Sequence, residues 1–137
     1  MDGAVLKRLR VNAGVAAAAG TFNGKPAIDH NERKSNAATA FPAAIQTVVA
    51  GPKNYNQDGP QRTRTWRLRW ETMSLDSDDG AVALGDAIVA ALEPADTIGD
   101  VRFGRGFLSF ERSFPPEDVG DLRIFRRIYD MDITATY

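Results

Sequence analysis

The chain has 137 residues, a formal net charge of −1, 43% hydrophobic side chains and 26% charged side chains. These values predict one ordinary domain over residues 1–137 and argue against a duplex-DNA binder, which carries an excess of Lys and Arg. The lack of cysteine excludes a disulfide scaffold, a thiolate metal site and a thiol nucleophile. No run approaches the roughly 18 apolar residues of a membrane helix, so no membrane contact is expected.

The near-neutral total hides an uneven distribution of charge along the chain. Residues 1–70 carry eleven Lys or Arg and four Asp or Glu, whereas residues 71–137 carry six and fourteen. One interpretation is that both sets coat a single surface and pair locally. The other is a molecule with a basic and an acidic side, which would favour association with copies of itself or with a charged partner.

The N-terminal part of the chain predicts helix followed by loop. Apolar residues recur at helical spacing over residues 3–19, which predicts one helix or two short ones with a break at Gly14. A short strand is expected at residues 27–28. The polar run at residues 29–39 lacks periodicity and predicts a mobile loop.

Two strands separated by a long loop are expected next. Residues 41–50 are apolar and β-branched, with Pro42 at their start, and residues 51–61 form a loop with Gly-Pro near both ends. Because most hairpin loops have about 2–5 residues, this length indicates a functional or disordered segment. In the strand that follows, Trp66 and Trp70 share one face. Core packing is the first interpretation of that face, and an exposed binding platform is the alternative.

The second half of the chain predicts a helix and then two strands. An acidic cluster at residues 76–79 supplies caps for a helix that runs to about Leu92 and covers the two tryptophans. Strands are expected over residues 101–114 and 122–136, joined by an acidic hairpin loop at residues 115–121.

The last predicted strand alternates apolar and polar side chains, so one face should lie on helices and the other in solvent or against a neighbour. Asp130 and Asp132 share the polar face. An edge or interface role is favoured for them over acid–base chemistry, because no apolar neighbour on that face would separate their pKa values.

The order of these elements predicts an α+β fold. We expect one mostly antiparallel β-sheet of about four to five strands with two to three helices packed on one face.

The sequence carries no complete catalytic or ligand-binding pattern. His30 begins an H-x-E string, but the cysteine pair of a zinc deaminase is missing. The acidic residues 76–79 lack the later ligands of a calcium loop. Residues 104–106 lack the third glycine of a dinucleotide fingerprint and are more typical of a bulge or turn. We therefore predict a protein that is not an enzyme, with no catalytic, cofactor-binding or metal-binding residues and no cofactor.

Four strings in this order, with the long loop after the first, carry a resemblance to a known family: AFPAAIQTVVA, RTWRLRWETMS, DDGAVALGDAIVAALEP and RIFRRIYDMDITATY. Together they resemble the tail-completion proteins of long-tailed bacteriophages and gene transfer agents, which are also called tail-terminator or tail-to-head joining proteins. The resemblance spans nearly the whole chain.

The resemblance implies a structural virion protein. Its relatives form a six-membered ring on the head-proximal end of the tail tube, end tube polymerisation and offer a docking surface to the head connector. The implied partners are copies of the chain itself as a hexamer, the tail tube protein and the head connector or stopper protein. DNA would pass through the ring lumen without specific contacts. The implied location is the tail or neck of the virion, after assembly in the host cytoplasm.

Candidate interface residues lie on the long loop, the basic strand, the acidic loop and the last strand; they are Lys53, Tyr55, Arg62, Arg67, Arg69, Glu117, Asp118, Asp130 and Asp132. Two alternatives stay open at this point. One is a small nucleic-acid-binding or regulatory module that uses the strand from Arg62 to Arg69 as a phosphate track, with the two tryptophans stacking on bases. The other is a different neck component, such as a head-closure protein.

Overall fold

The computed structural model describes residues 2–51, 55–56, 59–60 and 63–136. Its helices are α1 (Asp2–Arg10), α2 (Ala13–Ala18) and α3 (Asp79–Leu92), with a short 3-10 helix η1 at Ala38–Ala40. The main sheet contains β3 (Ile28–His30), β4 (Ala43–Ala50), β7 (Thr63–Leu75), β8 (Asp96–Ile98), β9 (Val101–Phe103), β10 (Phe107–Val119) and β11 (Leu122–Thr136). Two small hairpins are β1 (Thr21–Phe22) with β2 (Lys25–Pro26), and β5 (Tyr55–Asn56) with β6 (Gly59–Pro60).

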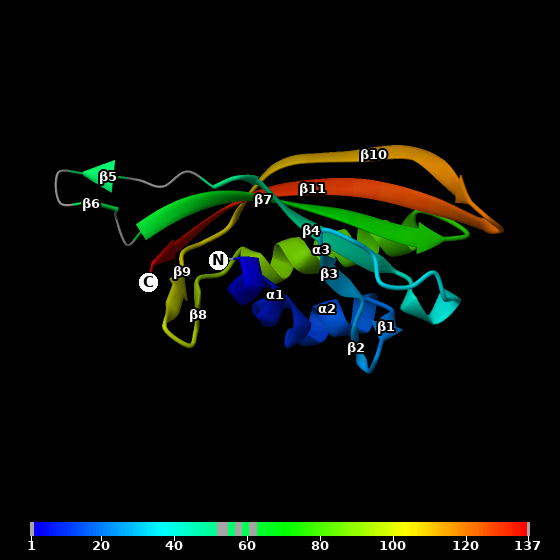
Figure 1. Cartoon of the computed structure of the whole chain (residues 1–137), viewed down its shortest axis with the longest axis horizontal. Helices are drawn as coiled ribbons and strands as arrows, with labels where there is room; N and C mark the ends of the chain where they lie inside the picture. The colour runs from blue at the N-terminus through cyan, green and yellow to red at the C-terminus, as the bar shows by residue number, and fades with distance from the viewer. Residues whose placement is uncertain (1, 52–54, 57–58, 61–62, 137) are drawn as a thin grey trace.

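The main sheet is arched, and the three helices lie on one of its faces (Figure 1). Its strand order is β3-β4-β7-β11-β9-β8, and β10 also pairs with β11. The β3–β4 pair is parallel and the other pairs are antiparallel. The α+β prediction, with a mostly antiparallel sheet and helices on one face, is confirmed. The described sheet has seven strands rather than four or five, because β8 was not expected and one expected strand is divided into β9 and β10.

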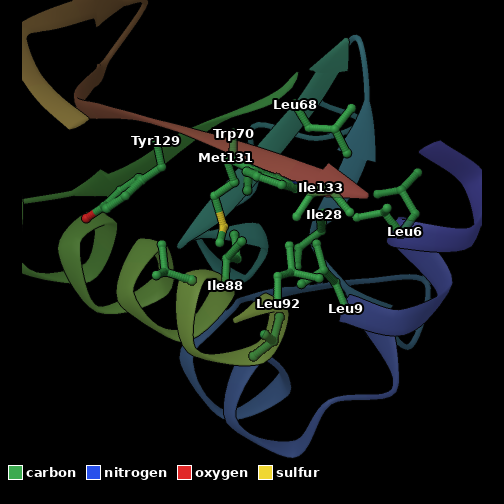
Figure 2. Packing of buried hydrophobic residues seen from close by; sticks show 14 of the residues in the cluster. Leu6, Leu9, Ile28, Leu68, Trp70, Ile88, Leu92, Tyr129, Met131 and Ile133 are labelled. Atoms are coloured by element: carbon green, nitrogen blue, oxygen red, sulfur yellow. The ribbon is translucent and has the colours of Figure 1, made fainter. Parts of the chain in front are cut away.

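The main core lies between α1, α2 and α3 and the covered face of the sheet (Figure 2). Trp70 and Tyr129 are fully buried there from neighbouring strands, in the same cluster as Ile88 and Leu92 of α3. The expected positions of α3 and of its apolar face are therefore confirmed. Trp66 packs against the same core but is only partly buried, so the two tryptophans are not equivalent.

The break between the first two helices lies at residues 11–12 rather than at Gly14, which is inside α2. Asn12 explains the position, because its side-chain oxygen accepts a hydrogen bond from the Val15 backbone N–H at 3.1 Å. A side-chain oxygen in this place satisfies an N–H that has no partner within the helix.

The strand expected over residues 101–114 is interrupted at residues 104–106, which belong to no helix, strand or turn, so the single strand is wrong. Gly106 lies against the C-terminal end of α3. Its N–H donates to the Leu92 carbonyl at 3.0 Å, and a Cβ at this position would lie 2.4 Å from the same oxygen. Only glycine permits so close an approach of two backbones.

The acidic loop expected at residues 115–121 is also wrong, because β10 continues to Val119 and only residues 120–121 form the turn to β11. Two consecutive prolines at positions 115 and 116 suggested a loop. Proline has no backbone N–H to donate. A strand tolerates it at a sheet edge, because no neighbouring strand lies on the outer side to need that hydrogen bond. Glu117 and Asp118 therefore lie in a strand rather than in a loop.

Two other predicted loops contain regular structure. Within residues 29–39, Asp29 and His30 belong to β3, and η1 begins at Ala38. The long loop at residues 51–61 contains the β5–β6 hairpin, which extends from the end of the sheet where β7 begins (Figure 1).

Asp78 occupies the N-cap position of α3, as the acidic cluster predicts, but its side chain makes no capping hydrogen bond. The Ser77 hydroxyl instead accepts from the Asp79 N–H at 3.4 Å. Among the described residues, the helices are too short or too polar to cross a membrane.

Candidate interaction surface

The face of the sheet opposite the helices carries a ladder of polar cross-strand pairs between β7 and β11. The register sets Arg67 across from Asp132 and Arg69 across from Asp130. Arg67 Nε donates to Asp132 at 2.9 Å. Arg69 binds both oxygens of Asp130, through Nε at 2.8 Å and a terminal nitrogen at 3.0 Å. Four of the predicted interface residues are therefore brought together, as partners of one another.

Threonine pairs continue this ladder toward the chain end. The hydroxyl oxygens of Thr65 and Thr134 lie 3.0 Å apart, and so do those of Thr63 and Thr136. Pairs of this kind directly opposite each other stabilise an antiparallel register. The ladder thus joins β7 to β11 along the part of the sheet nearest the β5–β6 hairpin.

Asp130 differs from the other ladder residues because it is buried, with only 5% of its surface exposed. The hydrogen bond with Asp130 raises the pKa of Arg69, and the hydrogen bond with Asp132 raises the pKa of Arg67. Of the edge or interface role expected for the two aspartates, the edge role is wrong, because β11 lies between β7 and β10, and the interface role stays a prediction. Each carboxylate is held by a guanidinium as a structural ion pair.

A second ionic cluster lies on the same face, centred on Arg126. One terminal nitrogen of Arg126 lies 3.2 Å from Glu71 and 3.5 Å from Glu117. Arg126 and Glu71 border a shallow depression of about 300 Å³ lined by Ile45, Thr47, Arg69, Glu71, Phe114, Arg126 and Ile128. The charged side chains that line it all have ion-pair partners: Arg126 pairs with Glu71, and Arg69 pairs with Asp130.

The other predicted interface residues are dispersed. Glu117 and Asp118 lie near the far end of β10, where Asp118 pairs in register with Arg123. Tyr55 is part of β5. Lys53 and Arg62 lie outside the described residues.

The ladder supports the local interpretation of the two charged halves. Arg67 and Arg69 belong to the basic half, and Asp130 and Asp132 belong to the acidic half, yet they neutralise each other within one molecule. The nucleic-acid alternative loses one of its two stacking residues, because Trp70 is fully buried, whereas Trp66 is partly buried. Its phosphate track also loses the two arginines that are committed to aspartates.

Sequence reasoning missed a group of exposed apolar side chains at the two sides of the sheet. They are Val48 and Val49 on β4, and Phe107, Leu108 and Phe110 on β10. The available signal was the uncharged string FLSF directly after the glycines at 104 and 106. This string indicates an exposed apolar surface only if its strand lies at a sheet edge. The pattern along one strand does not show which strands lie at the edges.

The described residues contain no group of three or more His, Asp or Glu side chains that could hold a metal ion. His30, the single histidine of the sequence, is a half-buried residue of β3.

No protein-family model matches the sequence, and a comparison with curated proteins gave no match. Among solved structures, the fold is similar to a chain of a structure described as the virion of a native gene transfer agent particle. The TM-score is 0.66 at 15% sequence identity, and the alignment covers 100% of this chain and 95% of the other. At this identity the similarity establishes a shared fold over the full length.

Proposed function

We propose that the protein is a structural component of a phage-like virion that forms a ring at the head-proximal end of the tail tube. In this role it ends tube polymerisation and joins the tail to the head connector. The observation that carries the proposal is the fold similarity to a chain of a gene transfer agent virion, which extends over the whole of this protein. The sequence resemblance to tail-completion proteins supplies the specific position in the particle.

The chemistry of the surface is consistent with a structural role. Four charged side chains of its open face form two ion pairs that join β7 to β11. Exposed apolar side chains of β4 and β10 lie at the two sides of the sheet. Surfaces of that kind mark contacts with other protein chains.

The hairpin within residues 51–61 is the proposed contact with the tube or with a neighbouring subunit. It extends from one end of the sheet, opposite the β10–β11 turn (Figure 1). Replacing residues 53–58 by an Asn-Gly turn removes most of this hairpin but leaves the paired parts of β4 and β7 unchanged. The variant should fold, and its particles should have tails of uncontrolled length or tails that fail to join heads. Particles of normal tail length and yield would show that the hairpin is passive.

The direct test of the function is the mass of the protein assembly, measured for the purified protein and in assembled particles. Light scattering of the purified protein and electron microscopy of assembled particles should both show a closed ring of copies, with a hexamer expected. Particles that lack the protein should contain separate heads and tails. A monomer in both states, or particles that join normally without the protein, would contradict the proposal.

A further inference from the structure

Two stretches at opposite sides of the main sheet have no outer neighbour within the described part of the chain. On one side, β3 pairs with residues 44–46 of β4 and leaves the β4 edge stretch, Thr47–Ala50, uncovered. On the other side, β10 pairs with β11 alone, and its first residues form the β10 edge stretch, Phe107–Phe110. An uncovered strand offers a row of backbone N–H and C=O groups to another chain.

The two edge stretches lie at the same level of the sheet, on opposite sides. When the register is followed across β7 and β11, Val48 is level with Leu108, and Ala50 is level with Phe107. A copy of the molecule placed beside the first at the same height would therefore bring one stretch against the other.

Both edge stretches are without charge, and three of the four residues in each are apolar. Val48 and Val49 are 39% and 45% exposed, and Phe107, Leu108 and Phe110 are 61%, 41% and 45% exposed. Proteins usually protect a sheet edge with charged residues, especially lysine, or with proline. Neither device is present in these two stretches; each contains instead a single register shift, between Val48 and Ala50 and between Leu108 and Phe110.

The remainder of β10 differs from the β10 edge stretch, because it contains both charged residues and proline. After Phe110 the strand contains the two prolines and four charged residues, namely Glu111, Arg112, Pro115, Pro116, Glu117 and Asp118. Protection of one half of an edge strand, with exposure of aromatic side chains on the other half, marks the exposed half as a contact surface.

The directions of the strands determine how the edges of two neighbouring copies can pair. The pairs β4–β7, β7–β11 and β11–β10 are each antiparallel, so β10 runs opposite to β4. In a neighbouring copy of the same orientation, β4 therefore runs antiparallel to the β10 that it meets. Such a contact joins different surfaces of the two copies, and repetition of it around an axis gives a closed ring.

We propose that the β10 edge stretch of one copy pairs with the β4 edge stretch of the next copy, so that neighbouring sheets join edge to edge. The partner is a second copy of this chain, and the contact consists of antiparallel backbone hydrogen bonds together with the exposed valine and phenylalanine side chains. The inference rests on the proposed ring only for the closure of the assembly.

Cysteine cross-linking tests the contact directly, because the natural sequence has no cysteine. The double variant Val48→Cys with Leu108→Cys, treated with a short bis-maleimide, should give covalent multimers up to the size of the ring. Each single variant should stay monomeric on a denaturing gel, since the contact joins two different edges. A control pair of Val48→Cys with Val11→Cys should give no multimers, because Val11 is 72% exposed but lies between α1 and α2.

A charge substitution supplies the second measurement. Phe107→Lys should convert the ring to monomers in light scattering without changing the melting temperature, since the side chain is exposed. The control Phe22→Lys changes an exposed aromatic in the β1–β2 hairpin and should leave the ring intact. A ring that forms normally in Phe107→Lys, or single variants that cross-link to themselves, would overturn the edge pairing while leaving the ring function in place. A wild-type monomer in particles would instead contradict the proposed function.

Discussion

β7 and β11 have an apolar face that is covered by helices and a polar face that is open. The apolar face stabilises the fold, whereas the polar face pairs charged side chains at the surface. On the covered face, Trp70 and Met131 are fully buried against helices. On the open face of the same strands, Arg69 pairs with Asp130 and Arg67 with Asp132. Burial of apolar area contributes about 1.5–3 kcal/mol for each large side chain, whereas exposed ion pairs contribute about 0–1 kcal/mol. Substitutions on the covered face should therefore change stability most.

The largest effect is expected at Trp70. Truncation to alanine removes a fully buried indole, whose Nε1 donates to Gln46 Oε1 at 3.0 Å, and should lower the free energy of unfolding by about 3–5 kcal/mol. The measurement is urea denaturation followed by circular dichroism. Trp66→Ala is the matched control on the same face and should cost clearly less, because that side chain is only partly buried. Equal losses for the two variants would contradict this difference.

The two faces also differ in how far the sequence predicts them. Period-two alternation identifies the buried face of both strands, and helical spacing identifies α3, because each pattern is local. The pairing of Arg69 with Asp130 is not local, since it depends on a register between residues 61 positions apart. The extent of β10 was missed for a related reason: its two prolines are acceptable only because the strand is an edge, and edge status is a property of the whole sheet.

The covered face is packed closely enough that one methyl group should disturb it. Gly85 of α3 faces the ring of Tyr129, and a Cβ there would lie 1.9 Å from Cε2 of that ring. Overpacking of this kind costs about 1–3 kcal/mol, and the better helix propensity of alanine offsets about 1 kcal/mol. The close approach to a buried ring places the cost at the upper end of that range, so we expect Gly85→Ala to lose up to about 2 kcal/mol in urea denaturation.

A matched glycine in another helix separates packing from propensity. A Cβ at Gly3 of α1 would meet nothing within 4 Å, so Gly3→Ala should not lose stability. A stable Gly85→Ala variant would mean that Tyr129 can move aside.

On the open face, the stability lost when an arginine is removed should depend on how deeply its partner carboxylate is buried. Arg69→Ala leaves Asp130, which is 5% exposed, without its guanidinium partner. The expected loss is about 1–2 kcal/mol, because Arg69 itself is partly exposed and water screens the pair. Asp130→Asn in the same background should recover part of the loss, since it removes the unpaired charge.

Arg67→Ala provides the comparison within the ladder, because its pair with Asp132 is open to solvent. Its effect should be small and should disappear at high salt. A loss as large as that of Arg69→Ala would show that burial of the carboxylate does not control the strength of these pairs.

The smallest effect at neutral pH is expected at Tyr129. Titration of its phenol tests how far the covered face holds this group away from water. Burial raises the pKa of the Tyr129 phenol above its ordinary value of 10.0, although the hydrogen bond from Arg127 opposes the shift. Asp86 and Glu111 act in the same direction as burial. The folded protein therefore keeps the phenol neutral at a pH where the unfolded chain ionises. The resulting stability is fully present below about pH 10 and is lost as the pH rises through the folded-state value.

Tyr129→Phe should remove this dependence. At pH 7 the variant should be slightly less stable than the wild type, because the hydroxyl no longer accepts the 2.8 Å hydrogen bond from Arg127 Nε. As the pH rises above 10, only the wild type loses the contribution of this phenol, so the difference between the two proteins should shrink. Urea midpoints measured for both proteins from pH 7 to about pH 11 give the comparison directly. Parallel curves over this range would mean that the phenol titrates alike in the folded and unfolded chains, and that the covered face does not hold it away from water.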